Sequence, residues 1–185
     1  MVSSRASACS MLAALIVLAV AAGCASIPGG VGRRASLAKA ILNNPRISLM
    51  SYHVSGRRDS ATALHNIQHT ARGGAARRSY YGRAPGGQVR LDARMLRAMN
   101  ALAKDGYSFR VTELAGGSHS SKSRHYLGVA FDVDSVNGHR VRHGHPSHRR
   151  FMRRCKRLGA TEVKGPGDRG HSSHIHVAWP RTGGR

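Results

Sequence analysis

The amino-acid sequence predicts an α+β fold in which helices flank an antiparallel sheet. Helix and strand patterns are mixed along the chain without the regular alternation that is typical of a parallel sheet, and no internal repeat is visible. The 185 residues, of which 41% are hydrophobic, suffice for one domain with a core of its own. This hydrophobic content excludes a wholly disordered basic chain.

Two helices and an extended segment are expected first. Residues 36–42 have a short helical pattern, and residues 47–53 are extended. Asp59 or Ser60 can cap a second helix that runs to Ala71, because their side-chain oxygens accept hydrogen bonds from a first helical turn.

The middle of the chain is expected to form a loop, a helix and two strands. Residues 74–87 are a loop rich in glycine and arginine, and Asp92 then caps a helix with one apolar stripe that Gly106 ends. Residues 107–114 alternate as a strand. Residues 128–136 form the next strand, which is followed by an Asn-Gly dipeptide typical of hairpin turns.

A helix and two short strands complete the expected fold. Residues 147–158 place apolar side chains on one face and arginines on the other, and Gly159 is the expected C-cap. The two strands, residues 161–164 and 174–179, enclose a glycine-rich loop.

The N-terminus is typical of an export signal. Arg5 precedes an apolar run at residues 11–22, which is too short to span a bilayer but has the length of a signal-peptide core. Small residues stand before Cys24 and resemble a bacterial lipobox, so Cys24 is expected to be the lipidated first residue of the mature chain. Ordinary cleavage near residues 19–21 is the alternative. In both cases the protein is expected in the cell envelope or periplasm.

Two segments carry side chains suited to a metal site. His125 and Asp132 are seven residues apart, and the small residues between them leave room for a metal against the backbone. His174 and His176 alternate on the last strand, so both imidazoles share one face. Two histidines and one aspartate, with a water in the fourth position, make an open zinc site suited to catalysis. In a chain with 12 histidines, chance pairs are the alternative.

The first segment resembles a known family. Residues 123–132, SRHYLGVAFD, match the pattern SxHxxGxAxD in full, and HIH follows at residues 174–176. Together they resemble the LAS metallopeptidases, which include lysostaphin-type enzymes, zinc D-alanyl-D-alanine peptidases and the hedgehog signalling domain. The match to the hedgehog and D,D-peptidase branch is close and covers residues 88–180. It implies the fold of that branch and a zinc-dependent peptidase of peptidoglycan.

The resemblance also implies a role for individual residues. His125, Asp132 and His176 are implied as zinc ligands. His174 is implied as the histidine beside the metal that stabilises the oxyanion, and His119 as a histidine that lines the site. Zinc lowers the pKa of its bound water to about 7 and polarises the scissile carbonyl, and a nearby imidazole offsets the negative charge that develops.

The general base departs from the family pattern. The position six residues before His176, where glutamate is often found, is Gly170. The nearest candidates are Asp168, His171 and Glu162. An imidazole can act as a base near neutral pH, whereas Asp168 in its glycine-rich loop can equally be a turn residue.

The chain divides into four expected segments. Residues 1–23 are the signal peptide of lipoprotein type, 24–35 a tether, 36–87 a helical and loop segment without a recognised motif, and 88–182 the zinc peptidase-like domain. Once the signal peptide has left and Cys24 is lipidated, no disulfide framework is expected.

The charge predicts the kind of surface that the protein meets. The chain has 30 Lys and Arg residues against 8 Asp and Glu, a formal net charge of +22. The cations are dense between residues 135 and 161, which contain no acidic residue: Arg140, Arg142, Arg149, Arg150, Arg153, Arg154, Lys156 and Arg157. For an exported protein, anionic envelope polymers or an anionic lipid surface are the expected partners. Nucleic acid is not expected, because aromatic residues are only 5% and no binding motif is present.

Three functions remain open at this stage. The first is a zinc peptidase that cleaves peptidoglycan peptides, as a D,D-carboxypeptidase or an endopeptidase. The second is a non-catalytic zinc-containing module that binds the envelope. The third, an exported nucleic-acid binder, leaves the metal-site residues unexplained.

Overall fold

A computed structural model of the chain describes Met1 and residues 30–181. The predicted signal peptide, Cys24 and the tether up to residue 29 lie outside the described residues, so export and lipidation stay predictions. Within residues 30–181, none of the helices has the length and apolar character needed to span a bilayer.

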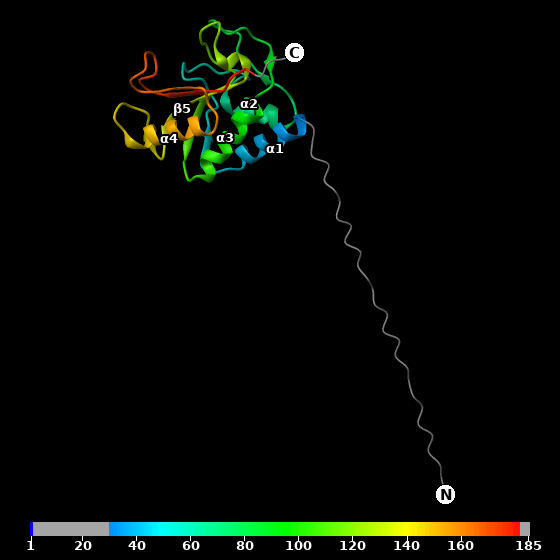
Figure 1. The fold of residues 1–185 in the computed structure, drawn as a ribbon. Helices are drawn as coiled ribbons and strands as arrows, with labels where there is room; N and C mark the ends of the chain where they lie inside the picture. The colour runs from blue at the N-terminus through cyan, green and yellow to red at the C-terminus, as the bar shows by residue number, and fades with distance from the viewer. Residues whose placement is uncertain (2–29, 182–185) are drawn as a thin grey trace.

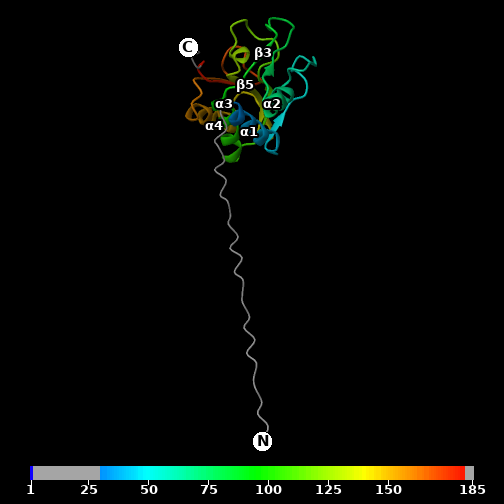
Figure 2. The ribbon, with the colours of Figure 1, turned by 90° about the vertical axis from the view of Figure 1, so that its right-hand side faces the viewer.

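The described chain has the mixed α+β architecture that the sequence predicts. Figures 1 and 2 show α1, α3 and α4 on one side of the central strand β5 (Ala130–Val136). The α-helices are α1 Gly30–Leu42, α2 Ala63–Ala71, α3 Ala93–Lys104 and α4 Pro146–Arg157. The helices pack on one another, and α4 also packs on β5, β7 and β8.

The sheet runs in the order β1-β4-β5-β8-β7, and β6 pairs with β5. Its pairs are antiparallel except β1 with β4, which is parallel, so the prediction of an antiparallel sheet is wrong at this edge. The reason is the connection through α2 and α3, a crossover that returns the chain in its original direction. The strands are β1 Ile47–Leu49, β4 Phe109–Glu113, β5 Ala130–Val136, β6 His139–Arg140, β7 Glu162–Lys164 and β8 Ile175–Ala178.

The segment 74–87, which was expected to be a loop, contains a short strand. Residues 74–87 contain β2 (Ala76–Arg77), which pairs with β3 (Gln88–Val89) as a small antiparallel ribbon. The side-chain amide of Asn66 on α2 donates a hydrogen bond to the Arg77 carbonyl at 2.9 Å and anchors this ribbon to the helix.

The first helix begins at Gly30 instead of residue 36, so residues 30–35 belong to the fold and the predicted tether is wrong there. The Arg34 guanidinium donates a hydrogen bond to the Leu91 carbonyl at 3.0 Å. This bond holds the first turns of α1 against the loop that precedes α3. The core continues from α1 to Trp179, so residues 36–87 pack into the same core as the rest of the described chain.

Helix caps follow the prediction in one case and correct it in another. Asp92 caps α3 by accepting a hydrogen bond from the Arg94 amide, and Gly106 follows the helix with φ of 90°, as predicted. Thr62, rather than Asp59 or Ser60, caps α2. The Asp59 carboxylate is engaged elsewhere, because it accepts a hydrogen bond from the Ala61 amide and contacts a buried histidine.

The two faces of the sheet differ in character. Phe131 on β5 is fully buried on the helical face, with its ring centroid 6.5 Å from that of Phe109 and 6.0 Å from that of Trp179. Because side chains alternate along a strand, the next residue, Asp132, points to the opposite face. His176 on β8 is the register partner of Asp132. The core therefore occupies one face, and polar side chains gather on the other.

Candidate metal centre

Three side chains from separate elements converge on the polar face of the sheet. His125 lies in the 3-10 helix η1 (Arg124–Leu127), Asp132 on β5 and His176 on β8. Asp132 Oδ1 is 2.8 Å from His176 Nδ1 and 3.2 Å from His125 Nε2, and these two nitrogens are 3.1 Å apart. All three side chains are buried. The structure thus brings together the three ligands that the sequence resemblance implies.

The spacing of serine, histidine and glycine before Asp132 has a backbone explanation. Ser123 caps η1, because its hydroxyl accepts a hydrogen bond from the His125 amide at 3.3 Å. Gly128 ends η1 in the left-handed region, with φ of 68°, and a Cβ there would lie 2.6 Å from the Arg90 carbonyl oxygen. Serine and glycine therefore serve the turn that delivers His125, while His125 and Asp132 carry the chemistry.

The outer nitrogens of the two histidines have partners of their own. His125 Nδ1 is 2.6 Å from the Leu114 carbonyl oxygen, which can only accept, so Nδ1 donates and Nε2 is the nitrogen that would bind a metal ion. His176 Nε2 lies 3.6 Å from the Glu162 carboxylate. Metal-ligating histidines usually have such outer partners, which fix the tautomer and the ring orientation.

The charges at this centre suit a cation. Burial would raise the pKa of Asp132, but the imidazoles of His125 and His176 hold it well below its ordinary value. Burial would likewise lower the pKa of His125, and the Asp132 carboxylate raises it overall. Asp132 is therefore ionised at neutral pH, which is the state in which a carboxylate binds a metal ion.

His119 forms the inner wall of the centre. Its ring is stacked on that of His125, with centroids 4.0 Å apart and planes 8° apart. His119, His125 and Asp132 each offer a ligand atom, and these atoms lie within 4.8 Å of one another, so this group could hold a metal ion. The other nitrogen of His119, Nε2, contacts the Gly116 carbonyl oxygen at 3.1 Å. Burial, and then the neighbouring His125, lowers the pKa of His119 to about 3, so the ring is neutral.

A cavity of about 430 Å³ adjoins the centre. His174 lies at its edge and also lines a second hollow on the side of His176. Burial lowers the pKa of His174, and so do the imidazoles of His171 and His176, although the Asp132 carboxylate acts in the opposite sense. The lining of the main cavity includes Glu113, His119, Asp132, Asp134, Arg140 and His174.

Two of the three candidate bases are engaged away from the cavity. Asp168 is exposed, and its carboxylate accepts a hydrogen bond from the Gly165 amide at 2.8 Å, so it stabilises a turn. Glu162 lies behind His176 and pairs with Arg124 at 3.0 Å and Lys164 at 2.8 Å. Both of its oxygens are paired with these cations, and its 3.6 Å distance from His176 Nε2 is longer than a hydrogen bond.

His171 is the candidate base that the structure leaves near the centre. Its ring centroid is 4.8 Å from that of His174 and 5.9 Å from that of His176. His171 Nδ1 lies 2.8 Å from the Arg169 carbonyl oxygen, so this nitrogen donates. The lone pair of a neutral His171 is therefore on Nε2, where it can accept a proton.

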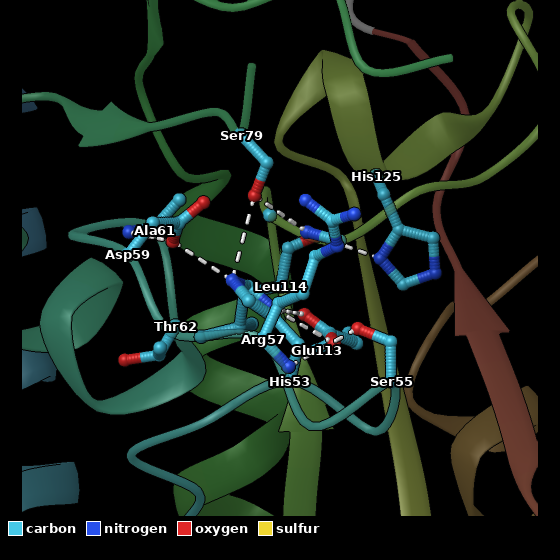
Figure 3. A network of polar contacts seen from close by, with 12 residues as sticks. His53, Ser55, Arg57, Asp59, Ala61, Thr62, Ser79, Glu113, Leu114 and His125 are labelled. Atoms are coloured by element: carbon cyan, nitrogen blue, oxygen red, sulfur yellow. Dashed lines mark hydrogen bonds and ion pairs between the residues drawn. The ribbon is translucent and has the colours of Figure 1, made fainter. Parts of the chain in front are cut away.

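A buried ion network beside the centre was not predicted from the sequence. Both oxygens of Glu113 lie 2.9 Å from His53 Nδ1, and Asp59 Oδ1 lies 2.8 Å from His53 Nε2 (Figure 3). A nitrogen that faces a carboxylate donates, so both ring nitrogens carry protons and His53 is an imidazolium. Burial would lower the pKa of His53, but the two carboxylates raise it to about 9. The one sequence feature that pointed to this network is Glu113, an acidic residue inside the predicted strand 107–114.

Ser79 gives this network the outline of a serine-hydrolase triad. Its hydroxyl is 3.4 Å from His53 Nε2, while His53 Nδ1 faces Glu113. Asp59 is closer to the same nitrogen, at 2.8 Å, and takes its proton. Ser79 is fully buried, and its oxygen accepts a hydrogen bond from the Gly117 amide at 3.0 Å. Without a free lone pair on His53 or access to Ser79, the group cannot act as a nucleophilic triad.

The chain matches no protein-family model, no curated protein and no solved structure. The family that the sequence resembles therefore stays a prediction. The function proposed below depends on the donor geometry of the centre and on the groups around it.

Proposed function

We propose that the protein is a zinc peptidase with a hedgehog/D,D-peptidase-like fold that hydrolyses peptidoglycan peptides. The observation that carries the proposal is the set of distances, 2.8, 3.1 and 3.2 Å, between the donor atoms of His125, Asp132 and His176. Ligand atoms about 2.0–2.1 Å from a tetrahedral zinc ion lie about 3.3 Å from one another. The three donor atoms therefore fit zinc with little rearrangement and leave a fourth position open.

His176 is a better third ligand than His119. The donor atoms of His176, Asp132 and His125 all lie within 3.2 Å of one another, whereas those of the group with His119 lie within 4.8 Å. His119 also lies parallel to the His125 ring, so it serves better as a neutral wall of the site.

The mechanism assigns separate tasks to three histidines. Zinc, when bound, supplies an activated water and polarises the scissile carbonyl. His171 Nε2 accepts the proton of the attacking water and returns it to the leaving amine. His174 donates a hydrogen bond to the oxyanion as negative charge develops. His119 keeps bulk water from the inner side of the centre, where interactions between charges are strongest.

The proposed substrate class is supported by the predicted export signal and by the sequence resemblance. A cavity of about 430 Å³ has the size of a small-ligand site and can take a few residues of a peptide. The competing function, a non-catalytic zinc module, is motivated by Gly170, which stands where related enzymes often have glutamate. The two functions differ in turnover and not in metal binding.

A muropeptide digest tests the proposal. The mature chain with one equivalent of zinc is expected to shorten or separate muropeptides, and the product masses distinguish carboxypeptidase from endopeptidase cleavage. Chelation should stop the reaction, and added zinc should restore it. His171→Ala should retain zinc and lower the turnover rate about 10²–10⁴-fold, because it removes a general base. Stoichiometric zinc without product favours the non-catalytic module, and a protein that binds no zinc overturns both.

We also propose that the outer face of α4 contacts an anionic lipid surface. Five exposed cations, which appear in no ion pair of the described residues, fall at spacings that place them on about one third of the helix circumference. They are Arg149, Arg150, Arg153, Lys156 and Arg157. The opposite face of α4 buries Phe151 and Cys155 against the sheet, so the metal centre lies on the far side. If Cys24 carries a lipid, five residues separate it from α1, so the connection can reach about 20 Å when extended.

Vesicle binding tests this contact. Replacing Arg149, Arg150, Arg153 and Lys156 by glutamine is expected to weaken binding to phosphatidylglycerol vesicles about 10- to 100-fold. The matched control replaces four exposed cations outside α4, Arg33, Lys39, Arg72 and Arg97, and so removes the same charge. Equal losses in the two variants would show that net charge, and not α4, governs binding. Muropeptide cleavage in solution should be unchanged in both.

A further inference from the structure

We infer that His53, Glu113 and Asp59 are positioning residues that hold the segment between β4 and η1 against the metal centre. The inference rests on the proposed zinc site, but it concerns how the site is held and not which bond is cleaved. In the described chain, none of the three side chains makes a hydrogen bond to His125, Asp132 or His176. Their effect on the metal must therefore pass through other groups.

The network joins three parts of the chain. His53 lies in the turn after β1, Asp59 lies before α2, and Glu113 is the last residue of β4, 60 positions after His53. The Asp59 carboxylate also accepts a hydrogen bond from the Ala61 amide at 2.7 Å, which fixes the entrance to α2. Figure 3 shows His53 between the two carboxylates, with Ser79 above it.

Glu113 leads directly into the segment that contacts the metal-site histidines. The next residue is Leu114, whose carbonyl oxygen accepts the hydrogen bond from His125 Nδ1 at 2.6 Å (Figure 3). Two residues later, the Gly116 carbonyl oxygen faces His119 Nε2 at 3.1 Å. A shift of Glu113 would therefore move both carbonyls that orient the two imidazoles.

Two glycines allow this segment to lie directly on the network. A Cβ at Gly116 would collide with the Ala61 carbonyl oxygen, and a Cβ at Gly117 would come within 2.9 Å of the Glu113 carboxyl carbon. The Gly117 amide donates a hydrogen bond to Ser79, whose oxygen in turn faces His53. These contacts hold the segment between β4 and η1 in place from the side away from the metal centre.

The charge of the network also suits the centre. β4 has register shifts between Val111 and Glu113, and such a bulge re-aims side chains at the end of a strand. Glu113 is paired across the sheet with Asp132, so two carboxylates are buried close together. The His53 imidazolium neutralises Glu113 and leaves the negative charge of Asp132 for the metal ion. An uncompensated Glu113 would be costly to bury and would have to move or take up a proton.

The test compares zinc affinity and backbone exchange in variants of the mature chain. Glu113→Gln and His53→Gln are each expected to lower zinc affinity, measured by chelator competition, by up to about 10-fold, less than the loss of a direct outer partner of a metal ligand, because their effect passes through the Leu114 and Gly116 carbonyls. Amide hydrogen exchange of residues 114–119 in the metal-free protein should become faster. Asp59→Asn, which leaves the Glu113 contact intact, should have a smaller effect in the same direction. The double variant should be no worse than the worse single one, because the two residues act as a unit.

Leu102→Ala is the matched control for lost stability. Leu102 is fully buried on the helical face of the sheet, so this variant should unfold more easily and keep wild-type zinc affinity while it is folded. If the network variants behave like Leu102→Ala, with unchanged affinity and unchanged exchange of residues 114–119, the network is only structural and the inference is wrong. A wild-type protein that binds zinc without cleaving muropeptides removes the peptidase function and leaves this inference standing. If the wild-type protein binds no zinc, the proposed function is wrong. The exchange experiment then still tests whether the network holds residues 114–119 in place.

Discussion

Replacing Asp132 by asparagine is expected to reduce zinc affinity by more than about 100-fold, beyond the loss typical of outer partners, and to abolish muropeptide cleavage. Asp132 is the single carboxylate among the three proposed ligands, and its oxygen lies 2.8 and 3.2 Å from the donor nitrogens of His176 and His125. The amide of asparagine has nearly the same shape but no charge. The loss therefore measures the carboxylate itself and not a cavity left by a smaller side chain.

Three other variants separate the proposed ligands from their neighbours. His176→Ala should lose zinc as Asp132→Asn does, whereas His119→Ala should keep most of its affinity, because its second nitrogen is bound to Gly116 and its ring only stacks on His125. His174→Ala should keep a full equivalent of zinc and lose turnover. Metal content after dialysis, chelator competition and the muropeptide digest measure these effects. Wild-type affinity in Asp132→Asn would remove Asp132 from the ligand set.

Local chemistry made several elements of the fold predictable. Asp92 and Gly106 bound α3 as expected, because a cap and a left-handed glycine act within a few residues of sequence. The first turns of α1 were not predictable in this way. Their sequence, GVGRRA, has weak helix propensity, and the turns are held by packing and by the bond from Arg34 to Leu91.

The strand pairing of the sheet was less predictable, because it depends on contacts between residues that are far apart in the sequence. The parallel pairing of β1 with β4 depends on a crossover through α2 and α3, and nothing in the three residues of β1 specifies its direction. β2 and β3 have two residues each, too few for an alternating pattern, and β2 depends on the Asn66 side chain for its place.

The candidate centre was partly visible in the sequence for the same reasons. His125 and Asp132 stand in one short pattern whose serine begins and whose glycine ends the 3-10 helix that carries His125, so the pattern is recognisable as a unit. The network of His53, Glu113 and Asp59 beside it could not be predicted from the sequence. His53 and Glu113 are 60 positions apart, and a buried histidine becomes a partner of a carboxylate only once the fold places them together.

The free energy of unfolding is expected to fall as the pH rises from 6.5 to about 9. His53 has a pKa of about 9 in the folded protein against 6.5 for an ordinary histidine. Between these values the folded state holds a proton that the unfolded state has released, so the stabilisation is complete below pH 6.5 and is lost as the pH passes through about 9. The difference corresponds to at most about 3 kcal/mol. Urea unfolding of the metal-free protein at several pH values measures it.

The groups that face His53 hold its proton in place, and His125, whose pKa the Asp132 carboxylate also raises, contributes to the loss in the same direction. Glu113 and Asp59 contact its two nitrogens, Tyr81 stands edge-on with ring centroids 5.6 Å apart, and the Arg57 guanidinium lies over the outer Tyr81 ring. Once His53 is neutral, Glu113 remains as an uncompensated buried charge, and this is the physical source of the loss. His53→Gln should be less stable at neutral pH and should have a flatter profile above it. Parallel profiles in the two proteins would assign the loss to other groups and would mean that His53 is not charged in the folded protein.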